Sequence, residues 1–201
     1  MLFSSDPVEL APGFWHLHGF ALGKPLREGI AQVSAAAPFR HLVVPSGQPM
    51  AVAMTNCGPL GWTSSAKGYQ YLPYDPDSQR PWPVMPDVFF SLAREAAAAV
   101  GCNDYEPDAC LVNRYAPGAG LGLHQDRDER NHRAPIVSVS IGVSCKFILG
   151  GLQRNAPTRS VALHDGDVMV WGGPSRLIFH GVRPLPLGSD TRYNLTFRKA
   201  G

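Results

Sequence analysis

The second half of the chain alternates apolar and polar residues with a period of two, the pattern of β-strands that bury one face. From Asp108 onward, stretches of this kind are separated by turn residues, and the clearest is VSVSIGV at 137–143. A tight turn is predicted at His164–Asp167, and the chain closes with RYNLTFR at 192–198. About five or six short strands separated by turns predict a barrel or a sandwich.

Two helices are predicted, and both precede these strands. DVFFSLAREAAAAV at 87–100 is the stronger, with Asp87 as its N-cap and Gly101 as its terminator. A second helix is predicted over 24–37, and the segment 45–86 between them, rich in Gly, Pro, Tyr and Trp, predicts hairpins and long loops. Helices that come first, with strands after, predict a β-rich α+β fold and argue against a doubly wound parallel sheet.

The composition fits one domain over residues 1–201. Hydrophobic residues make up 44% of the 201 residues, and 21 glycines and 19 prolines supply turns. The net charge of +2 is mild. It permits a nucleic-acid partner, but a binder that relies on charge alone shows a stronger basic bias.

The four cysteines, Cys57, Cys102, Cys110 and Cys145, form no CxxC pair, so free thiols are expected. The first ten residues, MLFSSDPVEL, have neither the basic start nor the apolar run of a secretory signal. No apolar stretch approaches the roughly 20 residues that a membrane helix needs. These features predict a cytoplasmic location and no membrane partner.

The stretch LHQDRDE at 123–129 contains two candidate metal ligands. On an extended segment, His124 and Asp126 would point to one face. His180 is the best third ligand, because it lies in the apolar stretch RLIFHGV. Two imidazoles and one carboxylate on one face of an octahedron suit non-haem Fe(II). The alternative, that His180 is an ordinary hydrogen-bonded core histidine, is favoured if HxD is the only signal.

The last predicted strand carries a second signal. In RYNLTFR, Arg192, Asn194, Thr196 and Arg198 share one face. If that face lies in water, an amphipathic strand explains the pattern. If it looks into a barrel, two buried arginines require an anion, and a small dicarboxylate would satisfy them.

Together these features resemble the Fe(II)/2-oxoglutarate dioxygenases of the AlkB nucleic-acid demethylase family. The stretches that carry the resemblance are AMTNCGPLGW, PDACLVNRYAPGA (107–119), RAPIVSVSIG (133–142) and GDVMVWGGPSRLIFHGV (166–182). The resemblance covers about residues 38–200. Two departures stand out: Gly120 replaces an expected lysine, and the first 37 residues match poorly.

The resemblance implies a double-stranded β-helix (jelly-roll) core at about 107–200, with N-terminal helices and a nucleotide-recognition lid at about 38–86. It implies Fe(II), 2-oxoglutarate and O2 as cofactor and cosubstrates. The implied iron ligands, which are also the catalytic residues, are His124, Asp126 and His180. The implied 2-oxoglutarate pocket comprises Asn113, Tyr115, Arg192, Asn194 and Arg198. Arg198 is expected at the distal carboxylate, and Arg192 at the end nearer the metal.

The resemblance also implies a substrate site made of Trp62, Tyr69, Asp128, Glu129 and Arg154. A base must leave the stack to be oxidised, and aromatic faces hold such a base. Trp62 would lie near the alkylated base, Tyr69 near its phosphate, and Asp128 would favour a cationic methylated base. Without the resemblance, Trp62 and Tyr69 could equally be core aromatics. Arg127, Arg130 and Arg133 could meet phosphates, although a solvated loop explains each of them.

The implied function is oxidative demethylation of 1-methyladenine and 3-methylcytosine in single-stranded DNA, with RNA as a further candidate. The reaction would release succinate, CO2 and formaldehyde, and the protein is expected to be a monomer. Two alternatives remain open. One is a 2-oxoglutarate-dependent hydroxylase of a protein or small molecule, and the other is a non-catalytic jelly-roll binding module.

Overall fold

The computed structural model describes residues 6–201. The first half of MLFSSDPVEL, where no secretory signal was expected, therefore lies outside the described residues. The helices are α1 (Leu26–Ala36), α2 (Asp87–Ala98) and the 3-10 helix η1 (Gly173–Ser175). The strands are β1 (Val8–Ala11), β2 (Phe14–Leu17), β3 (Ala53–Cys57), β4 (Gly61–Ser65), β5 (Gly68–Leu72), β6 (Ala109–Tyr115), β7 (Leu121–His124), β8 (Ile136–Gly142), β9 (Cys145–Leu149), β10 (Arg159–Leu163), β11 (Val168–Trp171), β12 (His180–Val182) and β13 (Arg192–Arg198).

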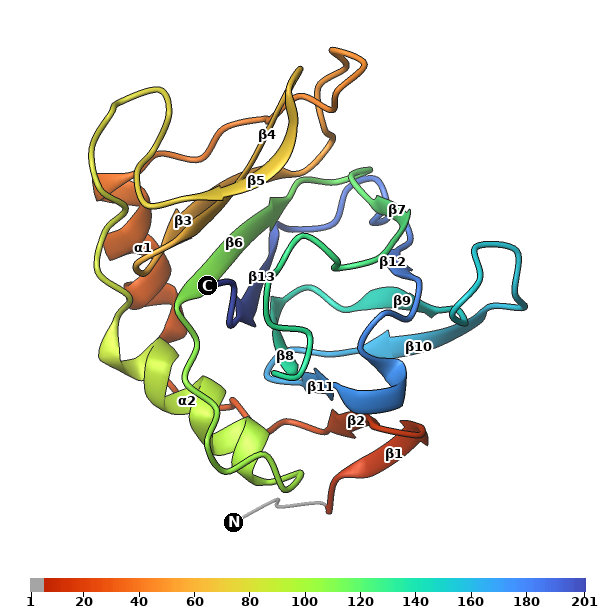
Figure 1. The fold of residues 1–201 in the computed structure, drawn as a ribbon. Helices are drawn as coiled ribbons and strands as arrows, with labels where there is room; N and C mark the ends of the chain where they lie inside the picture. Colours follow the sequence, from red (N-terminus) through yellow and green to blue (C-terminus); the bar gives the residue numbers. More distant parts are fainter. Residues whose placement is uncertain (1–5) are drawn as a thin grey trace.

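Two antiparallel sheets form the body of the molecule. The larger has the order β1-β2-β11-β8-β13-β6-β3, and the smaller has the order β10-β9-β12-β7. An apolar cluster between them joins side chains such as Ile136 and Trp171 of the larger sheet to Phe147 and Leu149 of the smaller. The two sheets face each other like the walls of a flattened barrel (Figure 1). The β-rich α+β class that the sequence predicted is confirmed.

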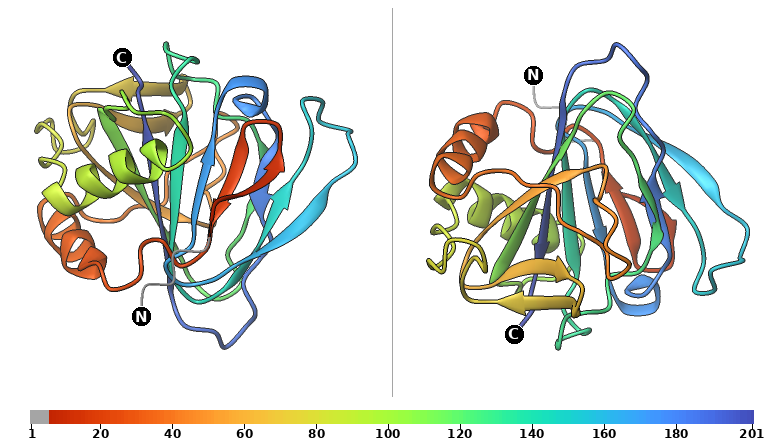
Figure 2. Two further views of the ribbon diagram at one scale, coloured as in Figure 1. Left: turned by 90° about the horizontal axis from the view of Figure 1, so that it is seen from below. Right: turned by 90° about the horizontal axis from the view of Figure 1, so that it is seen from above.

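The helices cover the outer face of the larger sheet, as the two turned views show (Figure 2). Val137, Val139 and Ile141 of β8 point outward into the cluster that contains the helix side chains. Ser138 lines the interior cavity instead. The period of two in VSVSIGV therefore separates a helix-facing side from a cavity-facing side.

The helix boundaries differ slightly from those predicted. Helix α1 begins at Leu26, after Pro25, and ends at Ala36, inside the predicted range of 24–37. Helix α2 ends at Ala98 rather than at 100. Its N-cap is Pro86, with no side-chain cap. Asp87 therefore does not cap the helix but lies in its first turn, where its charge favours the positive end of the dipole.

Other local predictions met mixed outcomes. The turn at His164–Asp167 is present, closed by a hydrogen bond from Asp167 N to His164 O of 3.1 Å. In RLIFHGV only His180–Val182 is strand, because the residues before it follow the 3-10 helix. The segment 45–86 contains the small hairpin β4–β5 and the edge strand β3. No helix within residues 6–201 is long and apolar enough to cross a membrane.

Candidate active site

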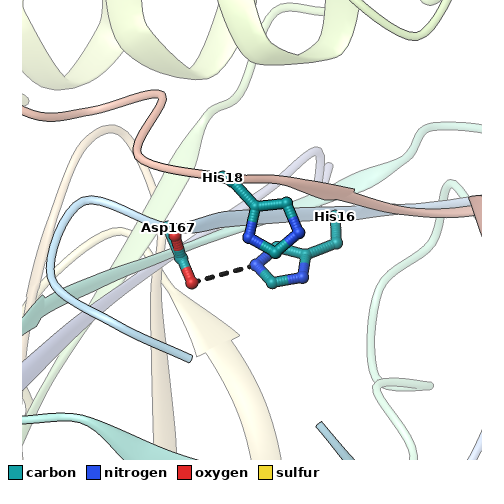
Figure 3. Close-up of side chains that lie close together, drawn as sticks. All are labelled: His16, His18 and Asp167. Carbon is teal, nitrogen blue, oxygen red and sulfur yellow. Dashed lines mark hydrogen bonds and ion pairs between the residues drawn. The ribbon is translucent and has the colours of Figure 1, made fainter. Parts of the chain in front are cut away.

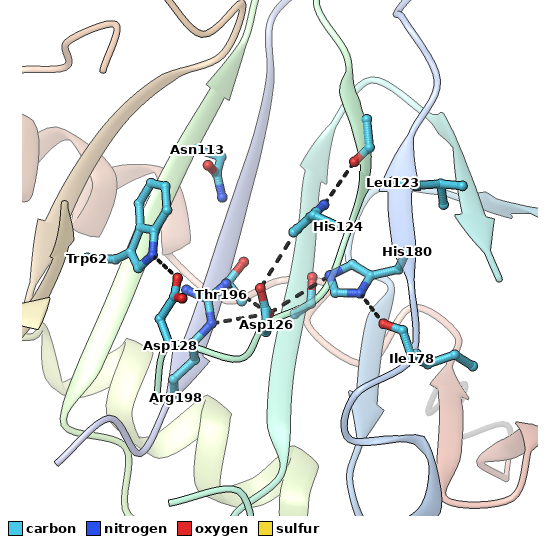
Figure 4. A network of polar contacts seen from close by, with 12 residues as sticks. Trp62, Asn113, Leu123, His124, Asp126, Asp128, Ile178, His180, Thr196 and Arg198 are labelled. Atoms are coloured by element: carbon cyan, nitrogen blue, oxygen red, sulfur yellow. Dashed lines mark hydrogen bonds and ion pairs between the residues drawn. The ribbon is translucent and has the colours of Figure 1, made fainter. Parts of the chain in front are cut away.

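Three potential metal ligands converge between the two sheets. His124 ends β7 and His180 begins β12, and the antiparallel register pairs these two residues directly. Asp126 follows two residues after the end of β7. Its carboxylate oxygens lie 3.7 Å from His124 Nε2 and 3.9 Å from His180 Nε2. Figure 4 shows the three side chains pointing toward one another.

The backbone structure that positions Asp126 differs from the predicted one. The extended strand ends at His124, so Asp126 is not on a continuous strand with it. Instead, Arg176 donates a hydrogen bond of 2.6 Å to the backbone oxygen of Asp126 and fixes the irregular segment. The spacing of His124 and Asp126 correctly indicated that they lie close together. The strand ends at His124, however, and it is the hydrogen bond from Arg176 that holds Asp126 in place.

Backbone carbonyls orient both imidazoles. His124 Nδ1 lies 2.9 Å from Gly122 O, and His180 Nδ1 lies 3.0 Å from Ile178 O. Since a carbonyl only accepts, each Nδ1 donates its proton, and each Nε2 carries the lone pair. Both lone pairs thus face the carboxylate of Asp126, which is how metal-bound histidines are commonly held.

The charge states also suit a cation. Burial would raise the pKa of Asp126, but Arg198 and the two histidines hold it well below its usual range. The residue therefore stays a carboxylate. Burial, with a contribution from His124, lowers the pKa of His180 to about 4, so its imidazole is neutral near pH 7. One carboxylate and two imidazoles, with all ligand atoms within 4.8 Å of one another, fit an Fe(II) ion.

A buried ion network supports the triad from behind. Arg198 Nη2 donates to Asp126 Oδ2 at 2.9 Å, and its Nε lies 3.2 Å from Glu129 Oε1. Glu129 also accepts from Arg176 at 3.1 Å and from the Tyr71 hydroxyl at 2.6 Å. Tyr71 lies on β5, so the network joins the β4–β5 hairpin to a metal ligand.

Arg192 is a second buried arginine, and part of its guanidinium has no partner within residues 6–201. Its side chain is 1% exposed, and its Nη2 donates to Ser140 Oγ at 2.9 Å. Its Nε and Nη1 have no hydrogen-bond partner in the described chain. A buried guanidinium with two free donors fits a carboxylate such as that of 2-oxoglutarate.

The positions of the two arginines favour the reverse of the expected order along the cosubstrate. Arg198 contacts the metal ligand Asp126, whereas Arg192 lies at the opposite end of β13. Alternation correctly indicated that both arginines share one face. It could not indicate which end of the strand lies beside the histidines, because that depends on how β7 and β12 pack against the larger sheet.

A cavity of about 580 Å³ brings most of the predicted residues together. The predicted residues that line it are Trp62, Tyr69, Asn113, Tyr115, His124, Asp126, Asp128, Arg154, His180, Arg192, Asn194 and Arg198. Glu129 is absent from the lining. Both of its oxygens are occupied by Tyr71, Arg176 and Arg198, so the expected contact between Glu129 and the base is not available.

The other four predicted substrate residues gather at the mouth of the cavity. Trp62 Nε1 donates to Asp128 Oδ2 at 2.9 Å, and the Trp62 and Tyr69 rings stack with centroids 5.3 Å apart. Arg154 approaches from another loop, with its Nη1 3.2 Å from Leu123 O. Arg127 is exposed and lines the same cavity, whereas Arg130 and Arg133 are exposed outside it.

Sequence reasoning missed two residues of this site. Arg176 is 4% exposed and bonds Asp126, Glu129 and Ala134. Tyr71 is the hairpin's link to Glu129. The signal for Arg176 was present, because an arginine beside the apolar run LIF raises the same question of burial that singled out Arg192. Nothing in the sequence distinguishes Tyr71 from its neighbours.

Comparisons with known proteins agree with this architecture. The model of the 2OG-Fe(II) oxygenase superfamily matches residues 13–198. The α-ketoglutarate-dependent dioxygenase AlkB of Escherichia coli is 54% identical over 199 residues, covering 96% of this chain and 92% of that protein. The AlkB homologue of Caulobacter vibrioides is 43% identical over 98% of this chain and 91% of its own length. The solved structure of OsALKBH1 superposes with a TM-score of 0.81 at 29% identity, covering 96% of this chain and 99% of that one.

The fold and the paired His-Asp-His and arginine sites define an Fe(II)- and 2-oxoglutarate-dependent dioxygenase. Within that superfamily, the chain belongs to the AlkB family. The similarity extends beyond residues 38–200, the range expected from the motifs, and reaches into the N-terminal segment that seemed to match poorly. The dioxygenase class also replaces the alternative of a non-catalytic binding module.

Proposed function

We propose that this chain oxidatively demethylates alkylated nucleobases, with 1-methyladenine and 3-methylcytosine in single-stranded DNA as its principal substrates and RNA as a further one. The proposal rests on membership of the AlkB family and on the chemistry of the cavity mouth. The reaction consumes O2 and 2-oxoglutarate and releases succinate, CO2 and formaldehyde. It would reverse the damage directly, without removing the base.

The observation that carries the proposal is the Trp62–Asp128 pair beside the triad. An indole offers a flat surface for an unstacked base. A carboxylate hydrogen-bonded to that indole at 2.9 Å places negative charge next to the same surface. Methylation at N1 of adenine or N3 of cytosine makes the base cationic near neutral pH, so this mouth favours methylated over unmodified bases.

The chain's own residues would hold the reactants as follows. His124, Asp126 and His180 hold Fe(II), and Arg192 and Arg198 bind the two carboxylates of 2-oxoglutarate, with Arg198 at the metal end. Asn113, Tyr115 and Asn194 complete the wall of that pocket. The chemistry that bound Fe(II) supplies is the coupling of 2-oxoglutarate decarboxylation to hydroxylation of an N-methyl group. The hydroxymethyl product then loses formaldehyde and leaves the repaired base.

We propose that residues at about 38–86 form a nucleotide-recognition lid that positions the substrate. The lid lies over a catalytic core at about 107–200, and both belong to a single domain spanning 1–201. Trp62 stacks on the base, and Asp128 orients its exocyclic amino group. Tyr69, whose side chain is 45% exposed at the mouth, and Arg154 meet the flanking backbone. Glu129 acts behind them by holding Tyr71 and Arg198.

The central experiment measures formaldehyde and succinate release with Fe(II), 2-oxoglutarate and 3-methylcytosine oligonucleotides, single- and double-stranded, as DNA and as RNA. Asp128→Asn keeps the shape but removes the charge. Since a charged hydrogen bond contributes about 1.5–3 kcal/mol, kcat/KM for 3-methylcytosine should fall roughly 10- to 150-fold. Turnover of a neutral base such as 3-methylthymine should fall much less.

The matched control is Glu106→Gln, which removes an exposed carboxylate outside the cavity. Equal losses on cationic and neutral bases in Asp128→Asn would contradict the role of its charge. If peptides drove succinate release and methylated oligonucleotides did not, the competing assignment as a protein or small-molecule hydroxylase would replace this one.

We also propose that the enzyme acts as a monomer in the cytoplasm. Its four cysteines are all free, which suits a reducing compartment. A sedimentation measurement that gave a dimer at assay concentrations would contradict the first part.

A further inference from the structure

A second cluster of potential metal ligands lies away from the cavity. It consists of His16 on β2, His18 just after β2, and Asp167 just before β11. Their ligand atoms all lie within 4.8 Å of one another. None of the three lines the active-site cavity. In Figure 3 the two imidazoles lie one above the other, and the carboxylate of Asp167 points at His16.

The strand pairing explains why these residues meet. β2 and β11 are antiparallel, with Met169 opposite His16 and Val168 opposite Leu17. The same register, extended by one residue, sets Asp167 opposite His18. Side chains that alternate on a strand place His16 and His18 on one side. His16 is therefore placed by β2 itself, whereas His18 and Asp167 each lie one residue beyond the paired strands.

Asp167 is held as a carboxylate. It accepts hydrogen bonds from Gly19 N at 2.8 Å, His164 N at 2.9 Å and His16 Nε2 at 3.0 Å. Burial raises its pKa, but these hydrogen bonds outweigh that effect and leave it lowered. A carboxylate has about four acceptor positions, so one remains open beside the two imidazoles.

A simple buried His16–Asp167 pair does not account for His18. The two side chains are 2% and 3% exposed, and their hydrogen bond does not need a third residue. His18 is exposed, yet its ring centroid lies only 3.7 Å from that of His16. No hydrogen bond within residues 6–201 holds the His18 ring there. The close approach of the two rings therefore has no explanation in the contacts of the described chain.

We propose that His16, His18 and Asp167 form a second metal site, which takes a divalent transition ion of the zinc class. Ligand bonds of about 2.0–2.2 Å put neighbouring ligand atoms about 3–3.5 Å apart on one ion, depending on the coordination geometry. The 3.0 Å between His16 Nε2 and Asp167 Oδ2 fits that spacing once the ion replaces the shared proton. Water would complete the coordination shell on the exposed side, next to His18.

The site would tie β2, the second strand of the larger sheet, to its neighbour β11. This makes it a structural clamp, distinct from the catalytic centre between the sheets. Since the ion binds only the folded chain with three ligands in place, it would raise the melting temperature in proportion to the logarithm of its concentration. The inference does not depend on the proposed substrate.

The test uses the full chain with the catalytic triad disabled by His124→Ala/His180→Ala. Zinc is titrated into this metal-free double variant against a competing chelator, and the melting temperature is followed in parallel. One zinc per chain and an increase in melting temperature are expected. Adding His18→Ala should weaken zinc binding at least about 100-fold, since loss of even an indirect support of a metal site commonly costs 10- to 100-fold.

His18 is exposed, so its removal should leave the fold intact, and circular dichroism checks this. The matched control adds His41→Ala instead, which removes an exposed histidine outside the cluster. Zinc binding that survives His18→Ala, or that His41→Ala abolishes equally, would overturn the proposal. A double variant that binds no zinc at micromolar free ion would overturn it as well.

Discussion

Replacing Arg192 with methionine should have opposite effects on cosubstrate binding and on stability. The guanidinium is 1% exposed and leaves Nε and Nη1 without partners. If these two donors are the ones that hold a carboxylate of 2-oxoglutarate, Arg192→Met removes both hydrogen bonds. The same change relieves the cosubstrate-free protein of a buried and incompletely paired charge.

The magnitudes follow from the contacts. Two charged hydrogen bonds at about 1.5–3 kcal/mol each amount to about 3–6 kcal/mol. The KM for 2-oxoglutarate should therefore rise by roughly 10² to 10⁴-fold. Removing the unsatisfied charge should stabilise the free protein by about 1–3 kcal/mol, partly offset by about 1 kcal/mol for the lost bond to Ser140.

Two assays separate these effects. Steady-state kinetics with varied 2-oxoglutarate gives the KM change. Thermal unfolding with and without 2-oxoglutarate gives the stability change, at about 2–4 °C per kcal/mol for a chain of this size. Without cosubstrate the variant should melt higher than the wild type. At a cosubstrate concentration that saturates the wild type but not the variant, the order should reverse, because the wild type gains more stabilisation from binding.

Arg114→Met is the matched control. Arg114 lies on β6, but its guanidinium is exposed and packs over the Phe39 ring, away from the cavity. Arg114→Met should raise neither the KM for 2-oxoglutarate nor the melting temperature of the cosubstrate-free protein. An Arg192→Met protein that melts lower without cosubstrate and keeps a normal KM would refute the reasoning from the unpaired donors.

Three further predictions concern other parts of the molecule. Gly181→Ala should weaken Fe(II) binding, measured by chelator competition, because the added Cβ would lie 2.6 Å from a backbone oxygen of β7. Gly122→Ala is the control and should bind iron normally, because a Cβ at Gly122 meets nothing within 4 Å. Burial raises the pKa of Asp75, but hydrogen bonds, first of all from Arg40, lower it below its usual value. Asp75 therefore stabilises the fold above a pH of about 3.9, and this contribution disappears as the pH falls further. Asp75→Asn should therefore lower the melting temperature at pH 7 and progressively less in acid, and an undiminished difference would contradict this assignment. A thiol reagent should label Cys102 first in the native protein, since the other three cysteines are buried, and mass spectrometry that finds another site first would count against it.

Local periodicity predicted the class of the fold and the shared face of Arg192 and Arg198, whereas most of the cosubstrate pocket and the substrate residues were implied by the resemblance to the AlkB family. The alternation in VSVSIGV and RYNLTFR predicts strands with one apolar side and one polar side. Once the polar side faces inward, Arg192 and Arg198 must meet an anion or an acidic partner. That reasoning needs no knowledge of strand order.

The details that failed depend on contacts between distant segments. Asp126 reaches the histidines through a bond from Arg176, fifty residues further along the chain. The order of the two arginines depends on which end of β13 lies beside β7 and β12. Glu129 is adjacent in sequence to Asp128 but turns inward to Tyr71 and Arg198. Local patterns carry no information about such pairings.

The link from Tyr71 through Glu129 and Arg198 to Asp126 has a thermodynamic consequence. One end of this chain of contacts lies on the hairpin above the cavity, and the other end is a metal ligand. Any ligand whose binding favours one position of the hairpin must then alter the affinity for iron. By linkage, iron alters the affinity for that ligand by the same factor. If the proposed nucleic-acid substrate shifts the hairpin when it binds, its apparent affinity depends on iron supply, and the two binding constants must be measured together.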